Sequence, residues 1–466
     1  MPGTDAGAES MLDLLNRHLA QPLLAWKAGS PHLQHLRVLE QSQYDSSDTI
    51  QDRQVRAVRA IVRHAWRTVP YYRDRWRRLG LHPDAVRTLD DLRQFPALTK
   101  ADIRQNGASL RSENYRGRFV FTKTTSGSTG VPLTVAVDSD AMAWKRACTI
   151  RSDQWSGWRL GSRVARLWGH GVAERGRWPA RLRRHLFDRE SYLNTLNVDE
   201  ARMAAFADDL CRKPPGLLFG HAHSLYLFAC YVQKHRPDAV RPDGIVSAAM
   251  TLHEWQRTAI ESAFGTQVTN RYGCEEVSLI ACECEEHRGL HVNADAVFTE
   301  IVPDDRLGST PGAGKLLVTD LTNRAMPLIR YQVGDVVVPS DRTCACGRGL
   351  PLIESVVGRD ADYVLTPAGT LISGISLTDH FATAIRGAAQ VQIVQERLQF
   401  LRLRMVPGDD FGTTSRNQIE ALVRNSFGPD MGYEVELVAS IPQEPSGKYR
   451  FCVSPVANAY IQSLVS

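Results

Sequence analysis

Nine consecutive residues combine two glycines with five hydroxyl side chains, in the order Thr124-Thr125-Ser126-Gly127-Ser128-Thr129-Gly130-Val131-Pro132. Backbone N–H groups in a glycine-containing turn, together with hydroxyls, can wrap a polyphosphate. The segment has neither the Gly-x-x-x-x-Gly-Lys order of Walker loops nor the Gly-x-Gly-x-x-Gly order of dinucleotide-binding turns, so both of those motifs are excluded. We predict a phosphate-binding loop here; a plain polar turn between strands is the alternative.

Four further segments come after this loop in the chain: Tyr272-Gly273-Cys274-Glu275-Glu276, Arg330-Tyr331-Gln332-Val333-Gly334-Asp335, Gly358-Arg359-Asp360-Ala361-Asp362 and Ser446-Gly447-Lys448. In this order, the five segments resemble the successive core motifs of adenylate-forming enzymes. The resemblance is closest to phenylacetate–coenzyme A ligase-like proteins and their CapK-type relatives. Two segments near the start support it, Val69-Pro70-Tyr71-Tyr72 and Phe95-Pro96-Ala97-Leu98-Thr99-Lys100.

The resemblance implies that ATP activates a carboxylic acid, giving an acyl-adenylate and pyrophosphate, before an acceptor attacks the acyl carbon. It places Tyr272 near the adenine, Asp335 and Arg359 at the ribose, and Glu276 on Mg²⁺ beside the phosphates. It assigns the phosphates to the loop residues Thr125, Ser126, Gly127, Ser128, Thr129 and Gly130. Hydroxyls, a metal ion and a mobile cation suit this chemistry, because phosphoryl attack needs positioning and charge neutralisation.

Lys448 is the predicted mobile cation. It comes directly after Gly447 in the C-terminal part of the chain, far in sequence from the nucleotide motifs. A long, flexible ammonium group can bridge the substrate carboxylate and the phosphate when a small domain closes. We therefore predict that Lys448 and Glu276 are catalytic; a solvated hairpin lysine is the alternative for Lys448.

Soft metal ligands form two groups on either side of a β-rich stretch. Cys282-Glu283-Cys284 and His287 to His291 precede the stretch, and Cys344-Ala345-Cys346 comes after it. Zinc prefers four tetrahedral nitrogen or sulfur ligands, and a closed set of four is structural. We predict zinc on Cys284, His291, Cys344 and Cys346 within the segment 282–346, with His287 or Cys282 as substitutes. The alternative is reduced cysteines packed in a core.

Hydrophobic periodicity predicts the elements that must position these residues. Gln54 to Trp66 is typical of an amphipathic helix, and Thr99 with Asp102 has the spacing of a helix-capping box. Short β-rich runs alternate with helical segments at 118–122, 163–167, 216–219, 244–247, 267–272, 315–320 and 335–338. This alternation favours an α/β domain.

A second, α+β unit is expected after Asp362, from strands near 389–394, 398–406 and 434–438 and a helix near 417–427. We predict a large ATP- and acyl-binding domain of several subdomains over residues 1–359. A small, mobile α+β cap would occupy residues 360–466.

Composition narrows the class of protein. The 466 residues are 43% hydrophobic and 23% charged, which excludes wholesale disorder. A net charge of +5 is too small to argue for nucleic acid, and no apolar run is long enough to cross a bilayer. Nine cysteines at this length exclude a disulfide-rich scaffold. With no signal peptide visible, we expect a reducing, cytoplasmic setting and no membrane association.

These observations favour an ATP-dependent ligase that joins a small carboxylic acid to coenzyme A. Transfer to an amine, in a natural-product or polysaccharide pathway, is one alternative. A non-catalytic, zinc-stabilised nucleotide-binding scaffold is another alternative. The presence of Lys448, Asp335 and Glu276 together argues against it, because a scaffold does not require all three. The resemblance also raises the expectation of a homodimer.

Overall fold

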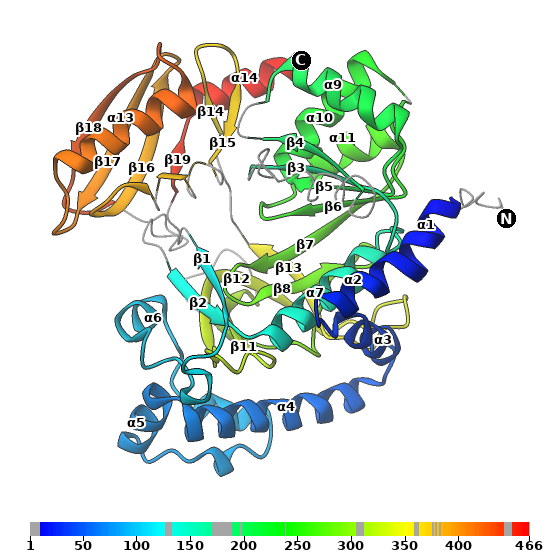
Figure 1. Ribbon diagram of the computed structural model, residues 1–466, viewed down its shortest axis with the longest axis vertical. Coiled ribbons are helices and arrows are strands. Elements are labelled where there is room, and N and C mark those ends of the chain that lie inside the picture. Colours follow the sequence, from blue (N-terminus) through cyan, green and yellow to red (C-terminus); the bar gives the residue numbers. More distant parts are fainter. Residues whose placement is uncertain are drawn as a thin grey trace.

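A computed structural model describes residues 10–125, 133–169, 189–195, 198–237, 239–303, 312–357, 363–374, 377, 380–381, 384–441 and 450–465. Figure 1 shows a large sheet with helices on its faces, helices α4 and α5 below it, and a small C-terminal sheet at the upper left. Within the described ranges, no helix is both long enough and apolar enough to span a bilayer.

Helices dominate the first hundred residues. They are α1 (Met11–Leu15), the π-helical turn η1 (Asn16–Ala20), α2 (Gln21–Lys27), α3 (His32–Ser42), α4 (Ser47–Thr68), α5 (Pro70–Arg78) and α6 (Lys100–Asn106). Three 3₁₀ turns lie between α5 and the first strand: η2 (Pro83–Ala85), η3 (Asp90–Gln94) and η4 (Glu113–Tyr115).

The longest of these helices, α4, confirms and extends the predicted amphipathic segment. The Ser46 side chain caps its first turn by accepting from the backbone N–H of Thr49. Val58, Ile61 and Val62 are buried on its inner face. The capping box of Thr99 and Asp102 at the start of α6 is also confirmed.

Eleven strands form one sheet. In chain order they are β3 (Val164–Trp168), β4 (Glu190–Asn194), β5 (Leu217–His221), β6 (Gly244–Ala248), β7 (Val268–Cys274), β8 (Ser278–Glu283), β9 (Leu290–Val292), β10 (Val297–Pro303), β11 (Gly314–Asp320), β12 (Tyr331–Ser340) and β13 (Leu352–Val357). Their spatial order is β10-β11-β12-β13-β9-β8-β7-β6-β5-β3-β4. The pairs from β4 to β7 are parallel, and those from β7 to β10 are antiparallel.

Helices cover the parallel half of this sheet. They are α7 (Ser139–Gln154), α9 (Glu200–Arg212), α10 (Ala222–His235) and α11 (Glu254–Phe264). Side chains of α9, α10 and α11 share one buried cluster with the strands, whereas α3 and α7 contribute to another. A third cluster joins α4 and α5 to the antiparallel half and to the hairpin of β1 (Phe121–Thr125) and β2 (Leu133–Val137).

The C-terminal part has its own sheet and core. It contains the hairpin β14 (Tyr363–Leu365) and β15 (Leu371–Ser373), then β16 (Ala388–Arg397), β17 (Phe400–Pro407), α13 (Thr413–Phe427), β18 (Gly432–Leu437), β19 (Cys452–Val453) and α14 (Pro455–Val465). The four-stranded sheet has the order β18-β17-β16-β19. Its core includes Ile393, Leu403 and Val423. The predicted domain boundary at 359/360 falls outside the described residues.

The mixed α/β class is confirmed, and each predicted strand overlaps an observed one. Several predicted strand starts differ from the observed ones, and two of these differences have a local reason. Arg118 and Phe119 precede β1, because the backbone N–H of Arg118 bonds Tyr115 in a turn. Leu398 lies in the turn between β16 and β17, whose last pair is Arg397 with Phe400. The sequence patterns single out no separate strands for β2, β4, β8, β9, β10 or β13.

A buried ion pair joins α7 to the antiparallel half of the sheet. The Lys145 Nζ lies 2.6 Å from the Asp320 Oδ2, and these side chains are 6% and 0% exposed. The same ammonium group donates to the carbonyl of Val277 at 2.9 Å. The other Asp320 oxygen accepts from the backbone N–H and the hydroxyl of Thr322. Both charges in this pair are therefore compensated, which buried ions require.

We predict that Lys145→Met lowers the free energy of unfolding by about 3–5 kcal/mol, because it leaves the Asp320 carboxylate buried without its counter-charge. Urea denaturation measures this loss. The control is Arg402→Met, which breaks a 2.7 Å pair with Glu434 whose side chains are 40% and 48% exposed; we expect a much smaller loss there, because solvent screens exposed pairs. Equal losses in the two variants would contradict the prediction.

Candidate functional site

Two of the predicted nucleotide-binding residues meet at the carboxyl end of β7. The Tyr272 hydroxyl donates to the Asp335 Oδ2 at 2.7 Å, and the aspartate is only 2% exposed. The register of β7 and β8 shifts beside Tyr272. A Cβ on Gly273 would lie 2.4 Å from the carbonyl oxygen of Ser278, so only glycine fits this close approach. The structure thus joins two motifs that are far apart in sequence.

Glu276 lies in the tight turn between β7 and β8 and is 5% exposed. Its Oε1 accepts a hydrogen bond of 2.8 Å from the Tyr331 hydroxyl, at the start of β12. The Arg104 guanidinium on α6 interacts electrostatically with both Glu276 and Tyr331, while burial lowers the pKa of Arg104. The carboxylate therefore lies in a fixed position, facing a positive charge.

Lys123 is a site residue that the sequence patterns miss. It lies on β1, and its Nζ donates to the Ser278 hydroxyl at 2.8 Å and to the Glu275 carbonyl at 3.3 Å. Burial lowers the pKa of this ammonium group. Its place on the strand leading into the phosphate loop is a usable signal, since alternate side chains of a strand share a face. Lys123 ties the β1–β2 hairpin to the turn that carries Glu276.

Arg330 has a structural position, although it opens one of the predicted motifs. Its Nε lies 2.9 Å from the buried Glu300 carboxylate, and its Nη1 donates to the carbonyls of Arg93 and Phe95. The backbone N–H of Leu98 bonds the Arg330 carbonyl at 3.0 Å. This explains why the segment from Phe95 and the segment from Arg330 occur together, since each holds the other in place.

Several predicted residues lie outside the described part of the chain: Ser126, Gly127, Ser128, Thr129 and Gly130 of the phosphate loop, Arg359, and Lys448. Thr125 is described only as the last residue of β1, where it pairs with Leu133. The strands on either side of the loop therefore form a hairpin that reaches the Glu276 turn through Lys123.

Four predicted metal ligands come together at the other end of the β7–β8 pair. One ligand atom from each of Cys284, His291, Cys344 and Cys346 lies within 4.8 Å of every other. The thiols of Cys284 and Cys344 are 3.6 Å apart, and the Cys346 thiol is 3.3 Å from the His291 Nε2. These residues come from the end of β8, β9 and the loop after β12, so the strand order itself assembles the group.

The surroundings of this cluster fit a metal ion with soft ligands. The His291 Nδ1 faces the Leu350 carbonyl at 3.3 Å, which requires the hydrogen on Nδ1 and leaves the Nε2 lone pair directed at the thiols. Burial lowers the pKa of His291 to about 4, so the imidazole is neutral at pH 7. Burial raises the pKa of Cys284. Burial also acts to raise the pKa of Cys346, but hydrogen bonds from Arg348, Cys344 and Cys284 together outweigh it, so that pKa is lowered.

The two substitute ligands lie elsewhere. Cys282 is fully buried in the core cluster beneath β8. His287 has its Nδ1 3.3 Å from the Glu283 carboxylate. Neither belongs to the group of four ligand atoms.

Two histidines at the end of β5 lie in aromatic surroundings. The His221 ring stacks on Trp168 with centroids 3.9 Å apart. The His223 ring lies against the Tyr363 ring, with ring centroids 4.4 Å apart. The Tyr363 hydroxyl is 3.0 Å from the Ser224 hydroxyl. Because Tyr363 begins β14, these contacts attach the start of the C-terminal part to α10.

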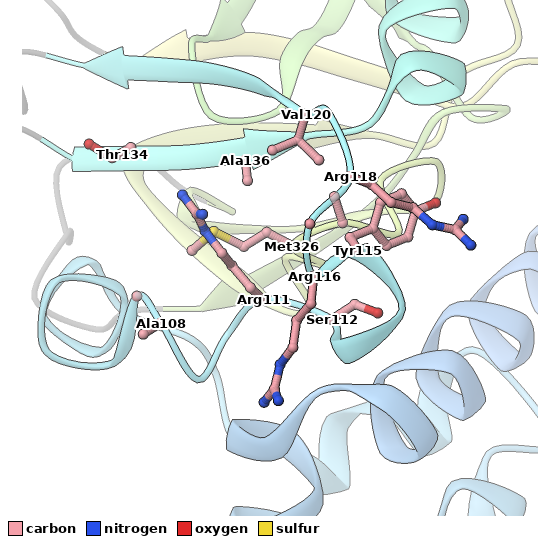
Figure 2. Close-up of a pocket in the computed structure, with 13 residues that line it drawn as sticks. Ala108, Arg111, Ser112, Tyr115, Arg116, Arg118, Val120, Thr134, Ala136 and Met326 are labelled. Atoms are coloured by element: carbon pink, nitrogen blue, oxygen red, sulfur yellow. The ribbon is translucent and has the colours of Figure 1, made fainter.

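A cavity of about 440 Å³ lies beside β2, apart from the residues predicted to bind nucleotide. Figure 2 shows the Arg111 side chain extending toward Thr134 and Ala136 of that strand, while Arg116 and Arg118 point away from it. Arg116 pairs with Glu113, and Arg118 lies over the Tyr115 ring. The predicted nucleotide and metal residues do not line this cavity.

We predict that His223 makes stability depend on pH. Burial lowers its pKa from 6.5 to about 4, so the folded chain holds it neutral while the unfolded chain protonates it below about pH 6.5. The stabilisation is therefore complete above pH 6.5 and lost as the pH falls toward 4, by on the order of 2–3 kcal/mol.

His223→Gln should flatten the fall in unfolding free energy between pH 6.5 and 4, as measured by urea denaturation at each pH. His18→Gln, at an exposed position, is the control and should behave like the wild type. The same pH dependence in His223→Gln and wild type would contradict the assignment.

Comparisons with known proteins agree with this geometry. The family model described as the CapK C-terminal domain matches residues 364–455. The chain is 28% identical to the phenylacetate-coenzyme A ligase of Escherichia coli over 69% of this chain and 73% of the relative. It is 22% identical to protein CapK of Staphylococcus aureus over 79% of this chain and 81% of the relative.

A solved structure of 2-hydroxyisobutyryl-CoA ligase, in complex with 2-HIB-AMP and CoA, superimposes with a TM-score of 0.59 at 18% identity. The superposition covers 91% of this chain and 94% of that one, which shows the shared fold. The chain is thus similar in sequence to phenylacetate-coenzyme A ligases and to protein CapK, its residues 364–455 match the CapK C-terminal domain, and it shares the fold of a solved CoA ligase.

Proposed function

We propose that the protein activates a small carboxylic acid with ATP and transfers the acyl group from the resulting acyl-adenylate to coenzyme A. The observation that carries this proposal is the hydrogen bond of 2.7 Å between Tyr272 and Asp335, beside the turn that carries Glu276. The contact of Lys123 with Ser278 adds the strand that leads into the phosphate loop. Three motifs from distant parts of the chain thus converge as an ATP site requires.

Asp335 and Tyr272 are the proposed nucleoside ligands. The Asp335 carboxylate is buried and its Oδ2 accepts from Tyr272, and we propose that the same carboxylate accepts hydrogen bonds from the ribose hydroxyls. The Tyr272 ring is partly buried against the core cluster that includes β2, and we propose that it offers a flat apolar surface to an adenine. Arg359 is proposed to approach the ribose from motif order alone.

Glu276 is the proposed Mg²⁺ ligand. Carboxylate oxygens are the donors that Mg²⁺ prefers, and the Tyr331 bond leaves the second oxygen of Glu276 for that purpose. When bound, the ion would offset negative charge on the phosphates. The chain's own part is to hold this carboxylate at a fixed place, through Tyr331 and through the Lys145 bond to the neighbouring Val277 carbonyl.

The loop from Thr125 to Gly130 is proposed to hold the β- and γ-phosphates, and Lys448 to neutralise charge between the carboxylate and the α-phosphate. The carboxylate oxygen attacks the α-phosphorus, the P–O bond to pyrophosphate breaks, and the pyrophosphate leaves with its electron pair. The thiol of coenzyme A then attacks the acyl carbon, loses its proton, and displaces AMP. Relatives named phenylacetate-coenzyme A ligase support both the carboxylic acid and this acceptor.

The test is a screen of aryl, fatty and amino acids for ATP-dependent pyrophosphate release, with and without coenzyme A. We expect release with at least one acid and a thioester product by mass spectrometry. An amide formed from added amines, with no thioester, would contradict the acceptor; no release with any acid would contradict the activity.

In the same screen, Lys448→Ala should lower carboxylate-dependent pyrophosphate exchange by on the order of 10²–10³-fold, because one preorganised charge on the transition state is lost. ATP binding should remain within about twofold of wild type, since ground-state binding does not need that charge. Lys234→Ala, at an exposed position on α10, is the matched control. Wild-type exchange in Lys448→Ala would contradict the role of this lysine.

We also propose a structural zinc ion on Cys284, His291, Cys344 and Cys346. Three thiols and one neutral imidazole would supply four ligands, the number that closes a structural zinc site and leaves no position for substrate. The loop of Cys344 and Cys346 is held from outside as well, because the Arg348 Nε donates to Gln43 beside α3 at 3.0 Å. Such an ion would fasten β8, β9 and this loop together, in the reducing setting that the sequence predicts.

Protein purified without chelator should contain about one equivalent of zinc by mass spectrometry of the metal. Cys346→Ser should lower that content by at least half and lower the melting temperature, since metal binding contributes to folding. Cys211→Ser, at an exposed cysteine outside the group, should change neither quantity. Less than a tenth of an equivalent in the wild type would contradict the proposal.

A further inference from the structure

Helix α6 is held against the start of β12 by backbone contacts. The backbone N–H of Leu98 donates to the Arg330 carbonyl at 3.0 Å, and the backbone N–H of Gln332 donates to the Leu98 carbonyl at 2.9 Å. The capping box of α6 begins the helix directly after this contact. Figure 1 shows α6 beside the hairpin of β1 and β2, which leads into the phosphate loop. The first turns of α6 therefore have a fixed position between that hairpin and the strand that carries Asp335.

Two long cationic side chains, Lys100 and Arg104, lie one turn apart on α6. Residues with this spacing share one face of a helix, about 6 Å apart along its axis. Both side chains are partly buried. Because two like charges at this spacing repel each other, the pair favours an arrangement in which its face of the helix meets negative charge. We call Lys100 and Arg104 the α6 cation pair.

The α6 cation pair meets the predicted nucleotide residues at two different points. A Cβ on Gly334 would lie 3.6 Å from the Lys100 Nζ, so this ammonium group lies over the backbone directly before Asp335. The Arg104 guanidinium interacts electrostatically with Glu276. Lys100 is thus close to the carboxylate proposed for the ribose, and Arg104 is close to the carboxylate proposed for Mg²⁺.

The charges of these four side chains balance in the free chain. The α6 cation pair carries two positive charges, and the carboxylates of Glu276 and Asp335 carry two negative ones. With Mg²⁺ on Glu276, the same group has an excess of two positive charges. Charges removed from water need compensation by ions of the opposite sign. The phosphates of ATP are the anions that adenylate formation brings to this place.

We propose that the α6 cation pair binds the phosphates of ATP, with Lys100 on the α-phosphate and Arg104 on the β- and γ-phosphates. This inference rests on the proposed function and adds two phosphate ligands to it. A guanidinium presents a planar fork of donors that suits bidentate contact with phosphate, whereas an ammonium group acts as a point charge. When the bond between the α- and β-phosphates breaks, Arg104 stays with the pyrophosphate and Lys100 stays with the acyl-adenylate.

The test is the equilibrium binding of ATP and of AMP to the full chain, measured by isothermal titration calorimetry with excess Mg²⁺. Arg104→Met should weaken ATP binding by about ten- to a hundredfold, because it removes hydrogen bonds between charged groups. AMP binding to this variant should remain within about twofold of wild type, since AMP has no β- or γ-phosphate. Lys100→Met should weaken the binding of both nucleotides at least about fivefold, because both contain the α-phosphate.

Arg104→Lys keeps the charge but loses the fork of donors, so its affinity for ATP should lie between those of wild type and Arg104→Met. Arg78→Met is the matched control, because it removes an exposed arginine from α5 and changes the net charge equally. Both of its affinities should equal those of wild type. An equal loss of ATP and AMP affinity in Arg104→Met, as expected if this residue only supports the fold, would overturn the proposal. Wild-type ATP affinity in that variant would overturn it as well.

Nucleotide binding is measured without turnover, so it separates this inference from the proposed function. A chain that binds ATP but releases pyrophosphate with no acid would contradict the proposed function, while the binding results for the variants would still support the α6 cation pair. Wild-type protein that binds neither nucleotide would overturn both proposals. Wild-type AMP affinity in Lys100→Met would overturn the placement of Lys100 on the α-phosphate.

Discussion

The site depends on one strand, β7, which pairs in parallel with β6 on one edge and antiparallel with β8 on the other. Parallel neighbours need a long crossover, whereas an antiparallel neighbour can begin after a tight turn. The chain therefore reverses within a few residues after Cys274 and places Glu276 in the turn at the carboxyl end of the strand that carries Tyr272. Ligands of open α/β sheets bind at the carboxyl ends of strands where the strand order changes, and this change of direction builds such a place.

Buried charges keep the surrounding loops in register. Lys145 with Asp320, Arg330 with Glu300, and Arg271 with Asp153 each join segments that are distant in sequence. A buried ion is tolerated only with its partner in place, so these pairs allow few alternative arrangements. Lys145 also reaches the turn of Glu276, and Arg330 holds the segment before α6, which carries Arg104. The site is thus supported from outside by groups that do not belong to it.

Much of this arrangement can be predicted from the sequence. The four predicted metal ligands are identified by residue type and order, and the structure brings their ligand atoms together. The motifs of Tyr272 and Asp335 are identified in the same way, and their side chains meet. Lys123 is not predicted from the sequence, because its contacts arise only when the β1–β2 hairpin packs against the turn between β7 and β8, far along the chain. The short strand β9 is not predicted either, because a segment of that length is too short to show a periodic pattern. The exposure of Met11, Leu12 and Leu19 in the N-terminal elements α1 and η1 cannot be predicted either, since periodicity does not tell which side of a helix faces the protein.

The C-terminal part is attached to the rest of the chain at both of its ends. Tyr363 and Leu365 of β14 lie in the same buried cluster as Ala457 of α14, together with residues of α9, α10 and α11. The four-stranded sheet and α13 lie between these two attachments along the chain. A rotation of that sheet that preserved both would have a single degree of freedom, about the line through β14 and the start of α14; any larger reorientation must first expose Tyr363 or Ala457 to solvent.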